Sequence, residues 1–248
     1  MFCCTTLEEV QLVIRDDMIS KAIIPISIDL PFLRKLTLGS NIRLRPEFMQ
    51  KLLHGCPLLE ELKLVCCFLY EMEIYSPLLK SLIIIDCDGF SMFISCPGLL
   101  HLDLELYSRE IRFTNLTSLE NAFIHFPVSG MDCYEILSSL SNATTMKLFG
   151  KQFQTIFKKD LAKCSTFKNL RELVLDECLK SRNFDIMACF RRCSPNLGKS
   201  CFRDIEEERP MEKAIDAPEH DGDAYNDDND DIYSNDDGDQ DEDEEYVD

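Results

Sequence analysis

Histidine, cysteine and acidic side chains are the groups in this sequence that could carry out chemistry. The chain has four histidines and 13 cysteines among its 248 residues. The histidines, at positions 54, 101, 125 and 220, stand far apart in the sequence. None belongs to a local Ser/His/Asp or Cys/His grouping of the kind that supports nucleophilic catalysis. The sequence therefore predicts a protein that is not an enzyme and that uses no cofactor.

The cysteines offer half of a metal site at most. Cys189 and Cys193 stand four residues apart on an expected helix, a spacing that zinc could use. No second pair follows, so we expect no metal and interpret the cysteines as small buried hydrophobic residues. The start, MFCCTTLEEV, lacks the basic and apolar stretches of a secretory signal. We therefore expect reduced thiols and a location in the cytoplasm, the nucleus or both.

Charge is concentrated at one end of the chain. Residues 204–248 hold 22 Asp and Glu against two basic residues and carry −20, whereas residues 1–203 carry +1. Such a body lacks the basic face that nucleic acid requires. No apolar run reaches the roughly 18 residues of a membrane span. We expect neither nucleic acid nor a membrane as a partner.

The composition of residues 204–248 predicts a disordered acidic tail. Large apolar residues nearly vanish there, so the segment cannot bury enough surface to offset the entropy lost on ordering. The chain thus divides into a body, 1–203, and a tail, 204–248. Ser234 is followed by Asn-Asp-Asp and is a candidate for phosphorylation by an acidophilic kinase. The tail could attract basic proteins such as histones, or it could only keep the chain soluble.

A short phrase recurs through the body. It consists of an apolar residue, two residues, an apolar residue, one residue and a third apolar residue, as in Leu59-Glu-Glu-Leu62-Lys-Leu64. The copies at Leu116 and Ala143 are weaker, and the copy at Leu197 is degenerate. Successive copies are 26, 26, 20, 20, 17, 27, 27 and 27 residues apart, mostly within the range of leucine-rich repeats. The copies begin at Leu7, Leu33, Leu59, Leu79, Leu99, Leu116, Ala143, Leu170 and Leu197.

The phrase predicts an α/β fold, a leucine-rich-repeat solenoid of about nine units. Each copy is a short strand whose apolar side chains point inward at a period of two. One strand cannot bury its face alone, so the units stack and their strands form a parallel concave sheet. Eight residues past the anchor, such repeats place an Asn or Cys that bonds the backbone of the turn. Asn41, Cys67, Cys87 and Cys178 occupy that position.

The return segments vary with the length of the unit. Longer units have room for helices, which we expect at 45–54, 131–140 and 183–192. The 20-residue units instead alternate apolar and polar residues at 71–75 and 90–94, which indicates short second strands. We expect helices near both ends of the solenoid and strands in its middle.

Alternate strand positions should face outward and form the partner-binding surface of the concave face. Among them Ile83, together with Ile85, is unusual because exposed aliphatic side chains can anchor a partner. Neighbouring side chains could instead cover both isoleucines. The predicted partner-binding residues are Lys35, Thr37, Glu61, Lys63, Ser81, Ile83, His101, Asp103, Glu105, Glu172, Val174 and Asp176.

Three phrases carry a resemblance to a known family. Cys56-Pro-Leu-Leu-Glu-Glu-Leu-Lys-Leu64, Ser76-Pro-Leu-Leu-Lys-Ser-Leu-Ile-Ile84 and Cys96-Pro-Gly-Leu-Leu-His-Leu-Asp-Leu104 resemble the plant F-box/leucine-rich-repeat family, including its FBD-containing members. The resemblance covers roughly residues 6–202. It implies repeats that recruit a protein substrate, and an F-box that binds the Skp-type linker of a cullin ubiquitin ligase.

The N-terminal F-box is missing from this sequence, which opens inside a repeat at Leu7. The resemblance therefore implies the substrate-recognition half of a ubiquitin-ligase adaptor. A Skp-type linker would be a partner only if an F-box exists upstream. The alternative is a second kind of leucine-rich-repeat protein, in which an acidic tail binds basic nuclear proteins such as histones.

Overall fold

The computed structural model describes residues 2–13, 27–39, 42–125, 133–150, 166–176 and 183–203. All of them belong to the first of two units into which the chain divides, Met1–Glu207 and Glu208–Asp248. Asn41, Cys178 and Ser234 lie outside the described residues, and so does the tail at 204–248. The predictions for these positions therefore stay predictions.

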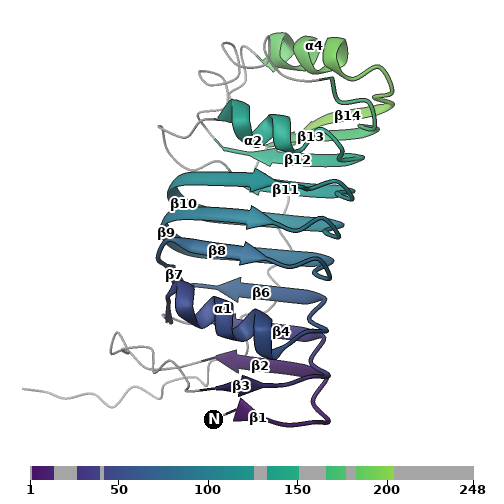
Figure 1. The fold of residues 1–248 in the computed structure, drawn as a ribbon. Coiled ribbons are helices and arrows are strands. Elements are labelled where there is room, and N and C mark those ends of the chain that lie inside the picture. Colours follow the sequence, from purple (N-terminus) through teal and green to yellow (C-terminus); the bar gives the residue numbers. More distant parts are fainter. Residues whose placement is uncertain are drawn as a thin grey trace, which may run out of the picture. The chain divides into compact units, whose positions relative to one another are not determined.

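Nine described strands lie side by side in the order of the chain and form one parallel sheet (Figure 1). Each pairs in register with the next, so equivalent residues of successive units form rows across the sheet. This confirms the leucine-rich-repeat solenoid. The strands are β2 (Glu9–Val13), β4 (Lys35–Gly39), β6 (Glu61–Val65), β9 (Ser81–Ser95), β10 (His101–Thr114), β11 (Asn121–His125), β12 (Thr145–Phe149), β13 (Glu172–Asp176) and β14 (Lys199–Arg203).

The return segments follow the predicted division. Helices α1 (Pro46–Gly55), α2 (Cys133–Ser139) and α4 (Asn183–Cys193) occupy the longer units. In the middle, β8 (Met72–Tyr75) is the second strand predicted at 71–75. The strand predicted at 90–94 is part of β9, which continues through its bend, as β10 does. The remaining strands are β1 (Phe2–Cys3), β3 (Ile28–Asp29), β5 (Arg43–Leu44) and β7 (Phe68–Leu69).

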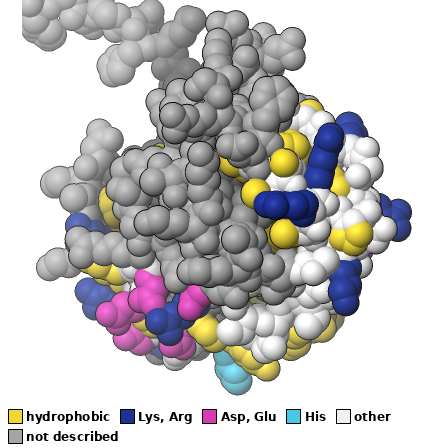
Figure 2. Space-filling view, turned by 90° about the horizontal axis from the view of Figure 1, so that it is seen from above, with side chains coloured by type: hydrophobic (Ala, Val, Ile, Leu, Met, Phe, Trp, Pro, Cys, Tyr) yellow, Lys and Arg dark blue, Asp and Glu magenta, His cyan; other side chains and the backbone are white. Residues whose placement is uncertain are grey.

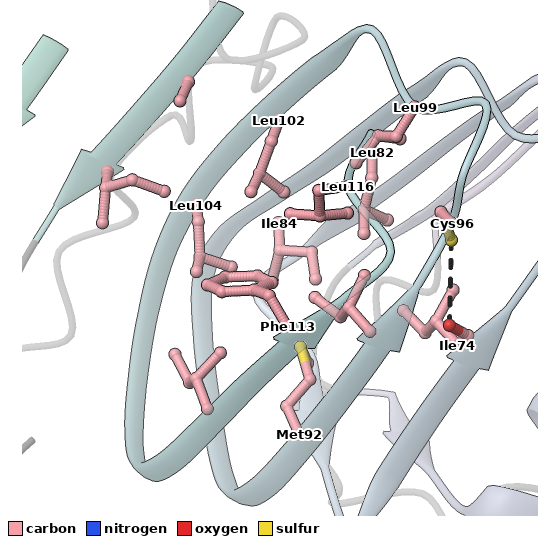
Figure 3. Packing of buried hydrophobic residues seen from close by; sticks show 14 of the residues in the cluster. Ile74, Leu82, Ile84, Met92, Cys96, Leu99, Leu102, Leu104, Phe113 and Leu116 are labelled. Carbon is pink, nitrogen blue, oxygen red and sulfur yellow. Dashed lines mark hydrogen bonds between the residues drawn. The ribbon is translucent and has the colours of Figure 1, made fainter. Parts of the chain in front are cut away.

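The core lies between the long sheet and these return segments. Leu82, Leu102 and their equivalents point inward from the sheet, and Met92 and Phe113 meet them from the returning halves of β9 and β10 (Figure 3). Each of these side chains is at least nine-tenths buried. The apolar residues of the repeated sequence pattern thus form the inner face of the sheet. The residues between them point to the outward side.

Two predicted turn cysteines do bond the backbone. The Cys67 thiol donates to the carbonyl oxygens of Leu38 and Val65, and the Cys87 thiol donates to those of Leu64 and Ile85. Both side chains are buried. The residue before each, Cys66 or Asp86, has a φ of 52° and makes the turn. This confirms the role assigned to the position in two units.

The sixth unit corrects the sequence analysis. In β11, Asn121 pairs with His101 and with Thr145, so the anchor of this unit is Leu119 and not Leu116. The sequence pattern itself favours Leu119, because a copy that begins at Leu116 puts the polar Asn121 at its third apolar position. A copy that begins at Leu119 has Ala122 and Ile124 at the apolar positions. The spacings around the sixth unit are therefore 20 and 24 residues instead of 17 and 27.

A second correction concerns the turn position of the fifth unit. The pairing of β9 with β10 shifts by one residue after Leu104, so Leu106 lies opposite Cys87. Tyr107, which simple counting placed there, pairs with Asp88 and is 48% exposed. This shift of register between β9 and β10 depends on how the two strands pair, so a count of residues along the chain cannot detect it.

Candidate protein-interaction surface

The outward side of the nine-strand sheet, here called the sheet face, carries the predicted partner-binding residues. Because the strands pair in register as far as the shift that follows Ile84 and Leu104, its outward positions form three rows. The first row is Glu9, Lys35, Glu61, Ser81, His101, Asn121, Thr145, Glu172 and Lys199. The second is Gln11, Thr37, Lys63, Ile83, Asp103, Phe123, Lys147, Val174 and Cys201. The third is Val13, Gly39, Val65, Ile85, Glu105, His125, Phe149, Asp176 and Arg203.

The first row is joined from strand to strand by polar contacts. Lys35 Nζ lies 2.8 Å from Glu61 Oε1, and Lys199 Nζ lies 2.9 Å from Glu172 Oε1. The hydrogen bond to Glu61, and then its charge, raise the pKa of Lys35. His101 Nδ1 is 2.9 Å from Asn121 Nδ2. These side chains contact one another along the stack, which reduces what they can offer to a partner.

A further row beside the first holds Arg34, Glu60 and Lys80, and its opposite charges also compensate one another. Glu60 accepts hydrogen bonds from Arg34 at 2.6 Å and from Lys80 at 3.0 Å. The Lys80 hydrogen bond is the larger cause that lowers the pKa of Glu60, and the charges of Lys80 and Arg34 add to it. Each pair is exposed, so it contributes little to stability. Alternating charge on successive strands instead favours this order of units, since like charges opposite one another destabilise a sheet.

The second row alternates charged and apolar side chains. Lys63, Ile83, Asp103, Phe123 and Lys147 follow one another on successive strands. Lys147 Nζ lies 4.4 Å from the centre of the Phe123 ring, a cation–π contact. Ile83 is neither covered nor fully exposed, and the same holds for Ile85 in the third row. The two isoleucines are therefore accessible in part.

The third row changes character between β9 and β10. Val65 and Ile85 are apolar, whereas the next two residues are Glu105 and His125. His125 Nδ1 lies 2.9 Å from Glu105 Oε1, and their side chains are 21% and 16% exposed. The centre of the face, here called the central patch (Val65, Ile83, Ile85, Glu105, Phe123 and His125), thus combines aliphatic and aromatic side chains with a half-buried polar pair.

The structure places the predicted residues in these rows, with one correction. Lys35, Thr37, Glu61, Lys63, Ser81, Ile83, His101, Asp103, Glu105 and Glu172 are at least partly accessible. Val174 is only 2% exposed, so it does not belong to the surface. Its short β-branched side chain is flanked in register by Lys147 and Cys201. The backbone of Asp176 pairs with Phe149, and its side chain lies outside the described set.

The sequence analysis missed the part of the face that β11 and β12 supply. Asn121, Phe123, His125, Lys147 and Phe149 all belong to it. With the sixth anchor at Leu116, the outward positions of this unit were displaced. The sequence signal for the correct register was the apolar pair Ala122 and Ile124, which follows Leu119 at the spacing of the repeat. Thr117 stands two residues before Leu119, where other units have proline, and its hydroxyl donates to the Pro97 carbonyl at 3.2 Å.

The described residues contain no group of three or more His, Cys, Asp or Glu side chains placed to hold a metal ion. Cys189 accepts a hydrogen bond from Arg192 at 3.0 Å, and the nine cysteines whose side chains the structure describes are free thiols. Among the described helices, none is both long and apolar enough to cross a bilayer. Seen from the α4 end of the stack, Asp and Glu side chains gather on one flank together with some Lys and Arg side chains, and other Lys and Arg side chains lie on the opposite flank (Figure 2).

Comparison with known proteins connects this repeat surface to one family. The family described as FBD-associated F-box protein At5g56370, LRR repeats, matches residues 1–200. No curated protein matches the chain. No solved structure matches it either.

Proposed function

Because the chain belongs to the family of FBD-associated F-box leucine-rich-repeat proteins, we propose that it binds a protein partner across the sheet face. In this proposal it is the substrate-recognition half of a ubiquitin-ligase adaptor. The central patch supports the proposal best. Partly accessible Ile83 and Ile85 lie beside the Glu105–His125 pair, which gives a partner both an apolar anchor and polar contacts that fix its orientation.

The ion pairs of the first row and of the row beside it limit where a partner can bind on the sheet face. Arg34, Lys35, Glu60, Glu61 and Lys80 contact one another through ion pairs. A partner that approached them would have to replace existing contacts. We therefore propose that they form the rim of the interface and that the second and third rows form its centre, because binding energy concentrates at the centre of an interface.

A role in a ubiquitin ligase depends on an F-box and on the Skp-type linker that it binds. A Skp-type linker would bind only where an F-box is present on the same polypeptide. In that setting the sheet face would present a substrate protein for ubiquitin transfer, and the chain itself would not be catalytic. We propose that this takes place in the cytoplasm or the nucleus, in keeping with the free thiols of the described cysteines.

Substitution in the central patch tests the proposal. Ile83→Glu should reduce capture of a face-binding protein at least about tenfold, because truncated hot spots commonly lose more than a factor of ten. Leu78→Glu is the matched control, since Leu78 is an aliphatic residue that is 49% exposed in a turn and lies outside the sheet face. The measurement is quantitative co-precipitation with both variants, followed by binding of the purified partner. Equal capture by wild type and Ile83→Glu would contradict the proposal.

The acidic tail supports a second candidate function. Residues 204–248 carry −20 beside a body of +1, so a basic nuclear protein such as a histone could bind the tail instead of the sheet face. Histone binding that weakens steeply with salt and is lost on deletion of 204–248 would favour this function. Histone binding that survives the deletion, or none at low salt, would remove it.

A further inference from the structure

The basic residues of the body are concentrated in its last units. Residues 1–142 hold 11 Lys and Arg against 18 Asp and Glu and carry −7, whereas residues 143–203 hold 13 against five and carry +8. The near-neutral total of the body therefore conceals a separation of charge along the stack. A charged ligand experiences this separation and not the total.

Four exposed cations of residues 143–203 lie where units turn into their sheet strands. We define the basic edge as Lys168, Arg171, Arg191 and Arg192, all of which are exposed. Lys168 and Arg171 precede β13, and Arg191 and Arg192 are in the last turn of α4, before β14. Figure 2 views this end of the stack and shows Lys and Arg side chains on a flank away from the gathered Asp and Glu side chains.

Hydrogen bonds bring the segment before β13 and the segment before β14 together. The Asn196 amide donates to the Lys168 carbonyl at 2.7 Å. The Phe167 N–H donates at 2.8 Å to the carbonyl of Cys193, the residue that follows Arg192. The four cations of the basic edge therefore lie on two adjacent segments, where one ligand can contact both.

The basic edge differs from the equivalent positions in the first units. Arg34 forms an ion pair with Glu60, which comes from the next unit. Arg171 has the same position in its own unit, but its backbone neighbours there are Thr144 and Gly198. Register thus gives Arg34 a carboxylate to bind and gives Arg171 none at the equivalent place.

The hydrogen bonds of Arg191 and Arg192 leave their charges uncompensated. Arg191 donates to the Ser200 hydroxyl at 3.3 Å and Arg192 to the Cys189 thiol at 3.0 Å, and neither acceptor is a carboxylate. Within the described part of the chain, no residue of the basic edge forms an ion pair. The five acidic residues of 143–203 can neutralise at most five of its 13 basic residues, so an excess of positive charge remains.

We propose that the basic edge binds an acidic segment of a protein partner, rich in Asp and Glu. Three of the four cations are arginines, and a guanidinium offers paired donors to a carboxylate. The charge of 143–203 attracts such a segment and the charge of 1–142 repels it, so the separation of charge directs it to this end of the stack. The proposal rests on the proposed function only in taking a protein as the partner, because the basic edge lies outside the sheet face.

The test uses the full chain and two rhodamine-labelled peptides. The acidic probe is acetyl-Glu-Glu-Gly-Glu-Glu-Gly-Glu-Glu-amide, and the neutral probe has Gln in place of each Glu. Residues 204–248 carry the same chemistry as the acidic probe, so a second full-length variant has Asn and Gln in place of every Asp and Glu there. Fluorescence anisotropy at low salt should show saturable binding of the acidic probe to both chains and none of the neutral probe. Added salt should weaken the binding, because it screens exposed charges.

Paired substitutions locate the contact. Lys168→Gln with Arg171→Gln should weaken binding of the acidic probe about tenfold, the effect of losing two exposed ion pairs. Among the described residues these two side chains form no hydrogen bond, so the fold should be kept. Arg43→Gln with Arg45→Gln is the matched control. It removes two exposed arginines from the first units and should leave the affinity unchanged.

Cross-linking identifies the bound position directly. A carbodiimide joins a carboxylate of the acidic probe to a lysine amine, and mass spectrometry identifies the lysine. We expect the cross-links at Lys168 and at other lysines of 143–203, and none at Lys35 or Lys80, which are paired with glutamates. Cross-links confined to lysines of 1–142 would overturn the proposal.

Three further outcomes would also overturn it. Equal binding of the neutral probe would show that charge is not recognised. Binding to the variant with the neutral 204–248 segment alone would assign the basic edge to the chain's own acidic residues. Tighter binding of a single-stranded RNA with the same number of charges would make the edge a nucleic-acid site. Ile83→Glu should leave probe binding unchanged, so failure of this proposal and failure of the sheet-face proposal are separate results.

Discussion

The middle and the C-terminal units of the stack attach each repeat to the one before it with different side chains. In the middle, which runs from β6 to β10, the donors are thiols. Cys67, Cys87 and Cys96 donate to carbonyl oxygens of the preceding unit at 3.6–3.7 Å, and all three are buried. In the C-terminal units, from β11 to β14, asparagine amides at or near the surface donate to carbonyls of the preceding unit, and so does the Thr144 hydroxyl.

The amide donors are three asparagines just before the anchors of their units. Asn142 donates to the Leu116 carbonyl at 3.3 Å and Asn169 to the Asn142 carbonyl at 3.4 Å. Asn196 donates to the Lys168 carbonyl at 2.7 Å. Both regions thus satisfy backbone carbonyls that the strand ladder leaves over. The donor differs because a thiol is small enough for a dry interior, whereas an amide also tolerates water.

The largest expected effect removes the aromatic contact that holds α4 on the C-terminal units. Phe190 is fully buried, and its ring centre lies 5.7 Å from that of Phe167. Phe190→Ala should lower the free energy of unfolding by about 3–5 kcal/mol. Because repeats contact only their neighbours, the loss should be local. Hydrogen exchange should then quicken in β13 and β14 while β6 and β9 keep their protection.

The same hydrogen-exchange experiment tests whether the two regions unfold independently. If exchange in β6 and β9 accelerates as much as in β13, the stack unfolds as one cooperative block and the two regions are not separate in energy. Ile84→Ala is the matched control in the middle, since Ile84 is fully buried in β9. It should remove protection on both sides of β9.

A glycine in each region provides the next test. A Cβ on Gly98 would lie 2.6 Å from the Pro77 carbonyl oxygen, whereas the nearest atom to a Cβ on Gly198 is the Arg171 carbonyl oxygen at 3.9 Å. Gly98→Ala should therefore destabilise the protein by about 2–3 kcal/mol, the upper part of the range for overpacking. Gly198→Ala should change stability by less than about 0.5 kcal/mol. Urea unfolding of both variants gives the difference, and equal midpoints would contradict it.

The strands could be predicted from the sequence more reliably in some units of the stack than in others. The apolar phrase located eight of the nine strands, because inward side chains must be apolar whatever their neighbours are. It failed at the sixth, where the copy was started at Leu116 although Asn121 breaks the pattern there, and pairing with β10 and β12 shows that Leu119 is the anchor. The asparagine donors were missed because such a donor was expected eight residues past the anchor of each unit. Asn169 instead stands one residue before its anchor.

The surface was less predictable than the core. Outward positions follow from alternation, so Lys63, Ile83 and Asp103 were found, but alternation says nothing of what covers a side chain, as Val174 shows. The pairing of Tyr107 with Asp88 was missed for another reason. It follows from the shift of register between β9 and β10 after Leu104. Such a shift depends on pairing between units and leaves no mark on the local pattern.

The thiols of the first and middle units should make stability depend on pH. Burial raises the pKa of Cys96 and of Cys56 from 9.0 to about 11. Below pH 9 both thiols are protonated in the folded and unfolded chains. Between pH 9 and about 11 only the unfolded chain ionises, so the free energy of unfolding falls by up to about 1.4 kcal/mol per pH unit for each thiol.

The measurement compares the free energy of unfolding of wild type and of Cys96→Ala, from urea unfolding between pH 8 and 11. The free energy of unfolding of Cys96→Ala should fall less over this range, by about 2 kcal/mol. Because amides do not titrate there, Asn169→Ala should keep the wild-type slope, which sharpens the contrast between the two regions. Parallel curves for wild type and Cys96→Ala would show that the buried thiol does not carry the pH dependence.

The smallest effect concerns the boundary between the regions, where a hydroxyl donates to a backbone carbonyl. The Thr117 hydroxyl donates to the Pro97 carbonyl at 3.2 Å and is exposed. Thr117→Val keeps the shape of the side chain and removes the donor, so it should cost about 0.5 kcal/mol, because water can replace the lost bond. Asn169→Ala should cost about 1 kcal/mol. If Thr117→Val costs more than Asn169→Ala, the change of donor does not reflect access to water, and the geometry of each turn would have to explain it instead.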